Sequence, residues 1–340
     1  MREITVVIPN YNGMKYLPEC LEALQNQESG TPDFAVLIVD NGSTDGSVEF
    51  LKEYGASEKN DVHDYAEARA IVWKNIFLPD NTGFCHAVNV GIQASDSPYI
   101  LLLNNDTKVY PSFIKNLYKA IEKDPRIFSV SSRMLMWDKP ELIDDAGDNY
   151  NVLGWAYARG KGRAKEHCDK ACQVFAACGG ASIYRKSVFE EIGLFDEEHF
   201  AYLEDLDIGY RARIYGYRNL YEPTAEVLHF GSASTGSRYN ERKTELASAN
   251  NIYVIGKNMP LLQLLLNLPF LCIGFAVKTL FFCKKGMGGT YLKGLWRGVK
   301  RCFSTVGRQN HVAFRWGHIG NYVKIQWELY LNTFRILMKS

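Results

Sequence analysis

The sequence of 340 residues predicts an α/β fold in which a mostly parallel sheet is covered by helices on both faces. Two observations lead to this fold class. Short apolar, β-branched runs alternate with segments of helical length in the N-terminal two-thirds of the chain, and such alternation is typical of right-handed crossovers between parallel strands. The runs are also followed by Asn, Asp, Ser or Gly, as expected where parallel strands open onto a binding edge.

The first two strand–helix units establish the pattern. Residues 4–8 form an apolar run that ends before Pro9, and the segment after it is helix-like because Leu17, Leu21 and Leu24 recur on one face. The remaining elements follow the same alternation. The expected strands are residues 4–8, 34–39, 70–73 and 99–103, and the expected helices are residues 14–25, 47–54, 84–94 and 111–123.

Small polar residues follow three of these strands and predict a nucleotide site. The turns would line one edge of the sheet, where carboxylates and amides reach a base and ribose while N–H groups and a metal face a diphosphate. Asp106, after the strand 99–103, suits a hard divalent cation. The alternative is an Asn/Asp turn that caps the next helix. The sequence contains neither G-x-G-x-x-G nor a Walker A loop, which disfavours hydride-transfer and P-loop enzymes.

Several segments, read together, resemble the family 2 glycosyltransferases of GT-A fold. They occur in the family's order over about residues 3–235 and are Val6-Val-Ile-Pro-Asn-Tyr-Asn12, Ile38-Val-Asp40-Asn-Gly-Ser-Thr-Asp45, Asn81-x-Gly83-Phe84-x5-Asn89-x-Gly91, Leu103-Asn-Asn-Asp106, Leu203-Glu-Asp205-Leu-Asp-Ile and His229. The resemblance implies a GT-A fold and the direct transfer of a sugar, with inversion at C1, from a nucleoside-diphosphate donor to a hydroxyl group.

The same resemblance implies a donor site and a metal site. It places the nucleotide sugar against Pro9, Tyr11, Asn12, Asp40, Asn41, Gly42, Ser43, Asn81, Gly83, Phe84, Asn89, Asn104 and Asn105. Asp40 would bind the base or ribose, and Asp106 and His229 would bind a divalent cation, Mn²⁺ or Mg²⁺. The chain departs from the family at Asn104, where the first metal-binding carboxylate is expected, so a single acidic ligand should weaken metal affinity. A packed structural histidine is the alternative for His229.

Glu204 and Asp205 are the predicted catalytic residues. A helix dipole favours acidic residues at a helix start, so an acidic first turn is the structural alternative. The resemblance makes Asp205 the general base, which must lie within hydrogen-bond reach of the acceptor hydroxyl. Glu204 would orient the acceptor or adjust Asp205. Asp207 is expected to point to another face of the helix and is given no catalytic role.

Further residues are expected around these carboxylates. Gly179 and Gly180 interrupt an expected strand and would form the floor of the acceptor or sugar pocket, with Tyr202 as a candidate platform. A glycine bulge without a ligand is the alternative. Arg238 and Arg242 are candidates for neutralising the diphosphate, since guanidinium groups form charge-assisted hydrogen bonds with phosphate.

The C-terminal part of the chain has a different character. From Leu246 onward the only acidic residue is Glu328, and residues 284–340 carry a net charge of +10 against −9 for the rest. Residues 259–277 carry no charge and approach the length of a membrane span. Their prolines and amides favour a broken helix that lies in the membrane interface. A helical hairpin packed on the catalytic domain is the alternative.

These patterns predict two regions. Residues 1–258 would form the catalytic domain, with a nucleotide-sugar half (1–125) and an acceptor half (126–258). Residues 259–340 would form a helical, amphipathic, basic region that binds an anionic membrane surface. The protein would be peripheral, or monotopic, on the cytoplasmic side of the cell membrane, since no signal-peptide core precedes the first strand. It would glycosylate a lipid-linked or polysaccharide acceptor in cell-wall or surface-polysaccharide synthesis, and rhamnosyltransferases are the subgroup that it resembles.

Three other classes of protein are the alternatives to a peripheral glycosyltransferase. A processive polysaccharide synthase would need several membrane spans and a Gln-x-x-Arg-Trp motif, but Val312 stands where the Gln would precede Arg315 and Trp316. A non-catalytic protein that binds sugar nucleotides or glycans is supported by Asn104. A nucleic-acid-binding protein would explain the basic tail but not the apolar segment beside it, so no nucleic-acid partner is predicted.

Overall fold

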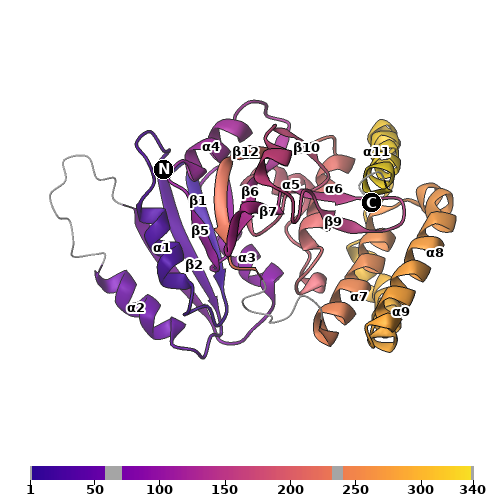
Figure 1. Ribbon diagram of the computed structural model, residues 1–340, viewed down its shortest axis with the longest axis horizontal. Coiled ribbons are helices and arrows are strands. Elements are labelled where there is room, and N and C mark those ends of the chain that lie inside the picture. Colours follow the sequence, from indigo (N-terminus) through magenta and orange to yellow (C-terminus); the bar gives the residue numbers. More distant parts are fainter. Residues whose placement is uncertain (1, 58–70, 232–239, 338–340) are drawn as a thin grey trace.

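The computed structural model describes residues 2–57, 71–231 and 240–337. A ten-stranded mixed sheet forms its centre, and helices of the C-terminal part gather at one end (Figure 1). The strands of this sheet are β1 (Ile4–Asn10), β2 (Phe34–Asn41), β3 (Val72–Leu78), β4 (Tyr99–Leu103), β5 (Thr107–Val109), β6 (Ile127–Met136), β7 (Lys139–Asp145), β10 (Cys172–Val174), β11 (Ala181–Arg185) and β12 (Arg218–His229). β8 (Asp148–Tyr150) and β9 (Ala156–Ala158) form a separate pair.

The helices follow the predicted alternation and then continue as a helical C-terminal part. They are α1 (Leu17–Gln25), α2 (Ser47–Ser57), α3 (Phe84–Gln93), α4 (Phe113–Ile121), α5 (Val188–Ile192), α6 (Glu204–Ile214), α7 (Glu241–Asn258), α8 (Leu261–Lys284), α9 (Gly288–Cys302), α10 (Thr305–Gln309) and α11 (Ile319–Leu337). The strand order is β10-β12-β6-β11-β4-β1-β2-β3, with β5 paired to β12 and β7 to β6.

The parallel pairs confirm the predicted fold class. β1 is parallel to β2 and β4, and β2 is parallel to β3, so the first part of the chain forms the expected parallel sheet. β11 is antiparallel to β4 and to β6, while β12 is parallel to β6. The carboxyl ends of β1, β2 and β4 consequently meet at one edge of the sheet.

β1 shows how both faces of the sheet are covered. Its Ile4, Val6 and Ile8 pack in one core cluster with α1 and α4, whereas Val7 packs with α3 and α5 on the opposite face. The alternation follows from the two-residue period of a strand. Burial of each of these aliphatic side chains contributes about 1.5–3 kcal/mol, which fixes the strand ends that carry the site.

Two predicted strands differ from the structure. The strand expected over residues 70–73 is β3, which begins at Val72 and continues to Leu78, and residue 70 lies outside the described part. Its partial burial at the edge of the sheet weakens the apolar signal. The strand expected to run through Gly179 and Gly180 is wrong, because these glycines form a turn and β11 begins only after them. The Gly180 carbonyl accepts the Asn104 N–H at 2.8 Å and anchors that turn.

α7 and α9 approach each other closely through two glycines of α9. A Cβ atom on Gly294 would lie 1.9 Å from Ser248 Oγ, and one on Gly298 would lie 2.4 Å from the Ala249 carbonyl oxygen. Real Cβ atoms do not come so near, so any larger residue would push the helices apart. The two helices are therefore held at a short distance along their length (Figure 1).

The predicted division at residue 258 does not separate two cores. One buried cluster contains Leu206 of α6 together with Leu329 of α11. An ion pair between Arg213 and Glu328 joins the same two helices. The C-terminal helices thus complete the core of the catalytic part, and the division is a proposal about function rather than about independent folding.

α8 has polar side chains on its inner face and apolar side chains on its outer face. Gln263 and Asn267 are buried and exchange hydrogen bonds of 2.6 to 3.0 Å with Gln326 of α11, while Leu262 is 77% exposed. The broken helix expected from the sequence is wrong, because α8 is continuous through Pro269 and its amides serve these tertiary contacts. Among the described helices, α8 is the one long and apolar enough to cross a membrane, judged by length and composition only.

Candidate active site

A cleft of about 380 Å³ lies at the carboxyl ends of β1, β2 and β4, where ligands bind in open α/β sheets. β12 and α6 also contribute to its walls. Many predicted site residues line it, namely Pro9, Tyr11, Asn41, Asn81, Phe84, Asn104, Asn105, Asp106, Gly179, Gly180, Tyr202, Glu204, Asp205 and His229. The fold therefore brings the predicted donor, metal, acceptor and catalytic residues into one cavity.

Asp40 and its neighbours support the cleft from behind. Asp40 is 1% exposed, and its carboxylate accepts hydrogen bonds from Asn10 Nδ2 at 2.7 Å and the Ser43 N–H at 2.9 Å. The Asn12 N–H donates to Ser43 Oγ at 2.9 Å, and Asn12 Oδ1 accepts the Thr44 N–H at 2.8 Å. These bonds join the turns after β1 and β2. Asp40 does not line the cleft, and its contact with a base or ribose stays a prediction.

Asn41 joins the turns after β2 and β3. Its Nδ2 donates to the Gly83 carbonyl at 3.1 Å, and its Oδ1 accepts the Thr82 N–H at 3.0 Å. Gly42 has a φ of +76°, and a Cβ atom there would lie 2.8 Å from the Asp80 backbone. Glycine alone adopts this backbone without strain and permits so close an approach. Gly42 and Gly83 thus shape the donor side of the cleft without lining it.

Asn89 lies away from the cleft. Its Nδ2 donates to the Phe195 carbonyl at 2.8 Å and to Glu197 Oε1 at 3.0 Å, and its Oδ1 accepts the Phe195 N–H at 3.0 Å. It borders a separate cavity of about 700 Å³ between residues 192–198 and 306–315. These bonds give Asn89 a structural role, which is to tie α3 to the segment before α6. Its contact with the donor stays a prediction.

Asp106 and His229 lie next to each other in the cleft. β5 and β12 pair in register at Thr107 and His229, which brings His229 Nε2 to 3.5 Å from Asp106 Oδ1. His229 Nδ1 lies 2.7 Å from Asp144 Oδ2, and a carboxylate behind a ligand histidine fixes its ring and tautomer. Burial disfavours the imidazolium, but hydrogen bonds to Asp106 and Asp144 outweigh this effect and raise the pKa of His229 to about 9.

The Asp106–His229 pair fits a divalent cation. Two ligand atoms 3.5 Å apart can both lie at about 2.1 Å from one ion, and carboxylate and imidazole are common ligands of first-row metals. Asn104 lines the cleft beside them but offers an amide instead of a second carboxylate. Asp144 was missed in the sequence, because 85 residues separate it from His229 and no motif marks it.

Glu204 and Asp205 begin α6 and line the same cleft. Asp205 Oδ1 accepts the Leu206 N–H at 2.7 Å, and its Oδ2 accepts the Gly179 N–H at 3.4 Å. Burial raises the pKa of Asp205, and burial together with the charge of Asp205 raises the pKa of Glu204 to about 8. A raised pKa makes a carboxylate a better proton acceptor, as a general base requires.

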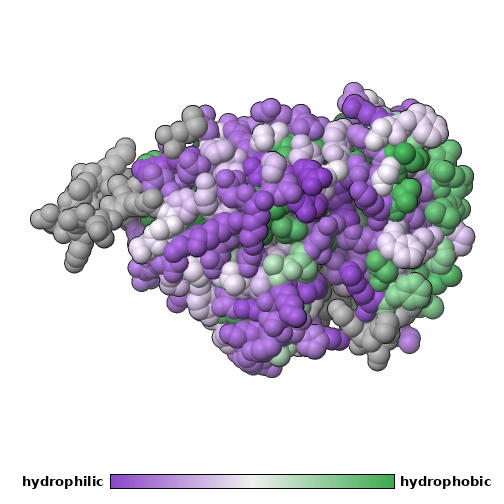
Figure 2. Space-filling view, turned by 90° about the horizontal axis from the view of Figure 1, so that it is seen from above, coloured by the Kyte–Doolittle hydropathy of each residue, from purple (hydrophilic) through white to green (hydrophobic). Residues whose placement is uncertain are grey.

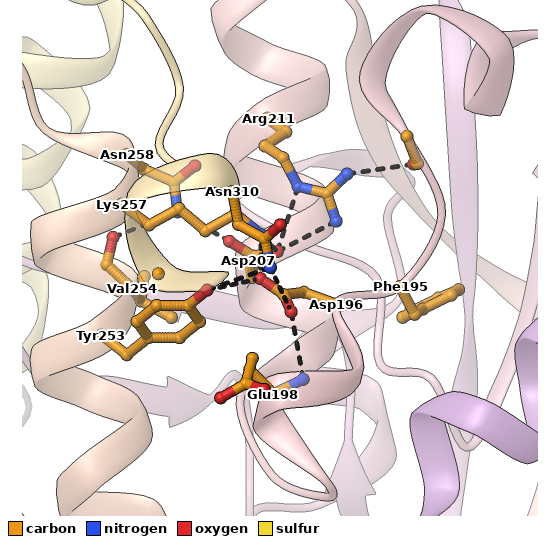
Figure 3. A network of polar contacts seen from close by, with 12 residues as sticks. Phe195, Asp196, Glu198, Asp207, Arg211, Tyr253, Val254, Lys257, Asn258 and Asn310 are labelled. Carbon is orange, nitrogen blue, oxygen red and sulfur yellow. Dashed lines mark hydrogen bonds and ion pairs between the residues drawn. The ribbon is translucent and has the colours of Figure 1, made fainter. Parts of the chain in front are cut away.

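Asp207 points away from the cleft into a buried network of polar side chains (Figure 3). Its carboxylate lies 2.8 Å from Lys257 Nζ and 2.9 Å from Arg211 Nη2, and it accepts a hydrogen bond from Asn258 at 2.8 Å. Burial would raise the pKa of Asp207, but the two cations hold it well below its usual range. The network fixes α6 against α7, in keeping with the absence of a predicted catalytic role for Asp207.

The loop that precedes α6 has an unusual backbone. Within this pre-helix loop, residues 199–203, the φ angles of Phe200, Tyr202 and Leu203 are +60°, +74° and +66°. Each such angle costs a non-glycine residue about 1–3 kcal/mol, so it persists only where surrounding contacts impose it. Phe200, Ala201 and Tyr202 line the cleft. Of these, the sequence predicted only Tyr202.

The first turn of α7 contributes a basic residue that the sequence analysis missed. Lys243 lines the cleft, and its N–H donates to the side chain of the helix-capping Asn240 at 2.8 Å. The Arg242 guanidinium lies 5.5 Å from the centre of the Phe200 ring. Arg238, the other predicted partner of the diphosphate, lies outside the described residues. The capping Asn was a visible signal that the next turn would be helical.

Buried acidic groups in and beside the cleft should make the metal-free protein less stable as the pH rises from about 6.5 to 8.5. Burial raises the pKa of Asp145 to about 7 and contributes most to the value of about 8 for Glu204, so the folded chain keeps protons that the unfolded chain, with carboxyl pKa values of about 4, has released. The stability that these groups contribute is complete below the pKa of the unfolded carboxyl groups. It declines above that pH and is lost once the pH has passed the pKa values of the folded groups.

Urea unfolding over this pH range in chelator would measure the effect. The buried His199, whose pKa burial lowers to about 4, acts in the opposite direction, but only below an unfolded pKa of about 6.5. His229, whose pKa is raised to about 9, acts in the same direction as the acidic groups and accounts for a pH dependence that remains without Glu204. Glu204→Gln should reduce the pH dependence, because Gln does not titrate. An unchanged slope in that variant would show that Glu204 is already ionised in the folded protein.

Comparisons with known proteins agree with this geometry. The family model described as glycosyl transferase family 2 matches residues 5–193. One curated relative, the N-acetylglucosaminyl-diphospho-decaprenol L-rhamnosyltransferase of Mycobacterium tuberculosis, is 29% identical over 231 residues, which cover 59% of this chain and 68% of the relative.

Two solved structures share the fold. The crystal structure of GalNAc-T7 with UDP, GalNAc and Mn²⁺ has a TM-score of 0.60 and 16% identity, covering 76% of this chain and 48% of that one. The mannosyltransferase PcManGT from Pyrobaculum calidifontis, in complex with GDP-Man and Mn²⁺, has a TM-score of 0.53 and 14% identity, covering 96% of this chain and 85% of that one. The chain therefore spans about half the length of GalNAc-T7.

Proposed function

Since the chain belongs to glycosyl transferase family 2, we propose that it moves a sugar from a nucleoside-diphosphate donor to a hydroxyl group of a membrane-held acceptor, with inversion at C1. One observation carries this proposal. A single cleft holds the Asp106–His229 pair, which fits a divalent cation, and the half-buried Asp205, whose raised pKa suits a general base.

Asp205 performs the proton transfer in this proposal. Its carboxylate takes the proton of the acceptor hydroxyl while the hydroxyl oxygen bonds to C1 of the sugar, and the bond from C1 to the diphosphate oxygen breaks. Asp106 and His229 would hold a divalent cation, Mn²⁺ or Mg²⁺, which would supply positive charge to stabilise the departing diphosphate. Lys243 lies in the same cleft and adds positive charge there. Glu204 orients the acceptor or adjusts Asp205.

The relatives suggest the class of substrates. The name of the mycobacterial relative describes a lipid-linked acceptor and an L-rhamnosyl donor, and the two structural neighbours hold UDP or GDP-Man with Mn²⁺. A nucleoside-diphosphate deoxyhexose or hexose and a lipid-linked glycan or polysaccharide of the cell surface are the corresponding proposal for this chain. The second candidate is a non-catalytic sugar-nucleotide or glycan-binding protein, which Asn104 favours by removing one metal-binding carboxylate.

Release of nucleoside diphosphate tests the proposal and separates the two candidates. The purified chain, with Mn²⁺ and a membrane extract as the acceptor source, is incubated with a panel of UDP-, dTDP- and GDP-sugars. Release from one donor that depends on the extract is the expected result. Binding of a nucleotide sugar without any release would support the non-catalytic candidate and overturn the enzyme.

The surface of the C-terminal helices supports attachment to a lipid surface. Apolar side chains gather at the end of the molecule formed by these helices (Figure 2), and Trp316 and Trp327 are 79% and 65% exposed. Tryptophan is enriched at the headgroup level of membranes. The same C-terminal part of the chain also carries exposed basic residues, namely Lys284, Lys285, Lys300, Arg308, Arg315 and Lys324. The inner face of α8 is occupied by α11, so we propose that α8 lies on an anionic membrane on the cytoplasmic side.

Vesicle binding should show both an apolar and an electrostatic part. The full chain is expected to bind anionic vesicles better than neutral ones, because each basic residue near such a surface contributes about 1 kcal/mol. Raising the salt to 1 M shortens the Debye length to about 3 Å, so it should release only a part of the protein. Sedimentation with vesicles of either composition measures the bound fraction.

Two substitutions and one control make this prediction specific. Leu262→Glu with Ile273→Glu places two charges on the exposed face of α8 and should abolish the salt-resistant part. Val72→Glu changes an exposed apolar residue at the far edge of the sheet and should leave binding unchanged. If the full chain fails to sediment with vesicles of any composition, the membrane proposal is wrong.

A further inference from the structure

One side chain of α7 forms hydrogen bonds with the backbone of the pre-helix loop. Asn250 is fully buried, and its Nδ2 donates to the carbonyl oxygens of His199, Ala201 and Tyr202 at 2.9, 2.9 and 2.8 Å. An amide nitrogen has only two hydrogens, so at least one of these bonds is shared. Asn is a poor helix former in a helix interior, and these contacts account for its place in the middle of α7.

Arg301 of α9 sets the orientation of that amide. Its Nη1 donates to Asn250 Oδ1 at 2.6 Å, and its Nε lies 3.7 Å from Glu198 Oε2. The guanidinium also lies 5.5 Å from the centre of the Tyr253 ring. Because Arg offers donors only, Oδ1 of Asn250 must face Arg301 and its nitrogen must face the loop. The charge of Arg301 strengthens the bond.

The loop held in this way leads directly into the catalytic helix. The Leu203 carbonyl accepts the Asp207 N–H at 3.0 Å and so starts α6, and the left-handed residues of the loop stand immediately before Glu204 and Asp205. A left-handed backbone at non-glycine residues needs outside contacts to persist. A shift of the loop would move Tyr202 and the start of α6. The donor-side turns after β1 and β2 are joined by their own hydrogen bonds and would stay.

We propose that Asn250 and Arg301 are positioning residues, which keep the pre-helix loop in the left-handed conformation that directs Asp205 and Tyr202 toward the acceptor. The inference rests on the proposed function, because only there is Asp205 the base. It assigns to α9 a role in the active site in addition to any role at a membrane. It also predicts that substitution of either residue impairs the acceptor step and leaves donor binding unchanged.

Asn250→Ala and Arg301→Gln test the inference, with Asn251→Ala as the matched control. Asn251 is the next residue of α7 and is also buried, but its Nδ2 donates to the Gly154 carbonyl at 2.7 Å, away from the loop. Three properties are measured in the full chain. They are hydrogen exchange of peptides covering residues 199–206, kcat and KM for the acceptor, and the Kd of UDP, dTDP or GDP, whichever the unaltered chain binds.

Faster exchange over residues 199–206 is expected in both test variants, with kcat/KM for the acceptor lowered by about 10²-fold, the scale of a 1 Å misplacement. The nucleotide Kd should stay unchanged, and Asn251→Ala should alter neither exchange nor acceptor kinetics. Arg301→Gln leaves the buried amide in place and covers the case in which Asn250→Ala does not fold. Equal effects in Asn251→Ala, or unchanged exchange in Arg301→Gln, would overturn the inference. Hydrogen exchange needs no substrate. Absence of turnover in the unaltered chain would therefore reject the proposed function, while the exchange rates still decide whether Asn250 and Arg301 hold the loop.

Discussion

Replacing Asp205 by Asn is expected to lower kcat by about 10²–10⁴-fold, the usual contribution of a positioned acid or base. Asn keeps the size of the side chain, and its single oxygen can still accept the Leu206 N–H, although the longer contact with the Gly179 N–H is lost. It cannot take the proton of the acceptor hydroxyl. The fold and the Kd for nucleoside diphosphate should be retained. Saturating donor and acceptor are used, so that kcat reports the chemical step.

The pH profile and a distant control complete this test. Burial raises the pKa of Asp205, so kcat/KM of the unaltered chain should fall on the acid side at a pH above the ordinary Asp value of about 3.9. Asp124→Asn removes the ion pair with Arg218, outside the cleft, and should leave kcat unchanged. Activity of Asp205→Asn within a few-fold of the unaltered chain would exclude Asp205 as the base.

Removal of the divalent cation with EDTA is expected to abolish transfer, and Mn²⁺ or Mg²⁺ should restore it. Asp106→Ala should resist this rescue, because it removes the carboxylate that lies 3.5 Å from His229 Nε2. His229→Ala should be less severe, since the carboxylate remains. Asp144→Asn should weaken Mn²⁺ affinity by about 10–100-fold, the usual effect of altering the partner of a ligand histidine.

Titration of activity with Mn²⁺ measures each of these effects. Glu141→Gln is a suitable control, because this exposed residue of β7 lies outside the cleft and its change should not alter the Mn²⁺ requirement. Full activity in chelator would contradict the metal proposal. The charge of the diphosphate would then have to be neutralised by side chains, and Lys243 and the His229 imidazolium are described cations that line the cleft.

The parts of the fold that the sequence revealed are those with local signals. β1, β2, β4 and the helices between them have regular periodicity and polar turns, so their order and the edge where they meet were predictable. The position of the candidate cleft followed from that edge together with the family motifs. β3 was harder to place because an edge strand is only partly buried, and the turn at Gly179 looked like strand because apolar residues flank it.

The residues that escaped prediction act across long separations in the chain. Asp144 contacts His229 although 85 residues separate them in the sequence, and Arg301 contacts Asn250 across a separation of 51 residues. No spacing rule connects such pairs. α8 was misread for a related reason, since its amides looked like interruptions of an apolar helix until Gln326, 59 residues beyond Asn267, was seen to bind them. Hydrophobic pattern predicts that a segment avoids water, but not which of its faces meets protein.

The contacts between α11 and the middle of the chain also constrain how the protein can be synthesised. The Val152 N–H pairs with the Leu329 carbonyl at 3.2 Å, so residues near 150 cannot reach their final state until α11 has left the ribosome. At about 5–20 residues per second, this delay lasts some ten seconds or more. During it, the unfinished core beside α6 stays exposed to solvent, because Leu329 of α11 belongs to the same buried cluster as Leu206. Folding therefore completes late and through contacts distant in sequence, which favours slow kinetics and sensitivity to aggregation when the chain is produced quickly.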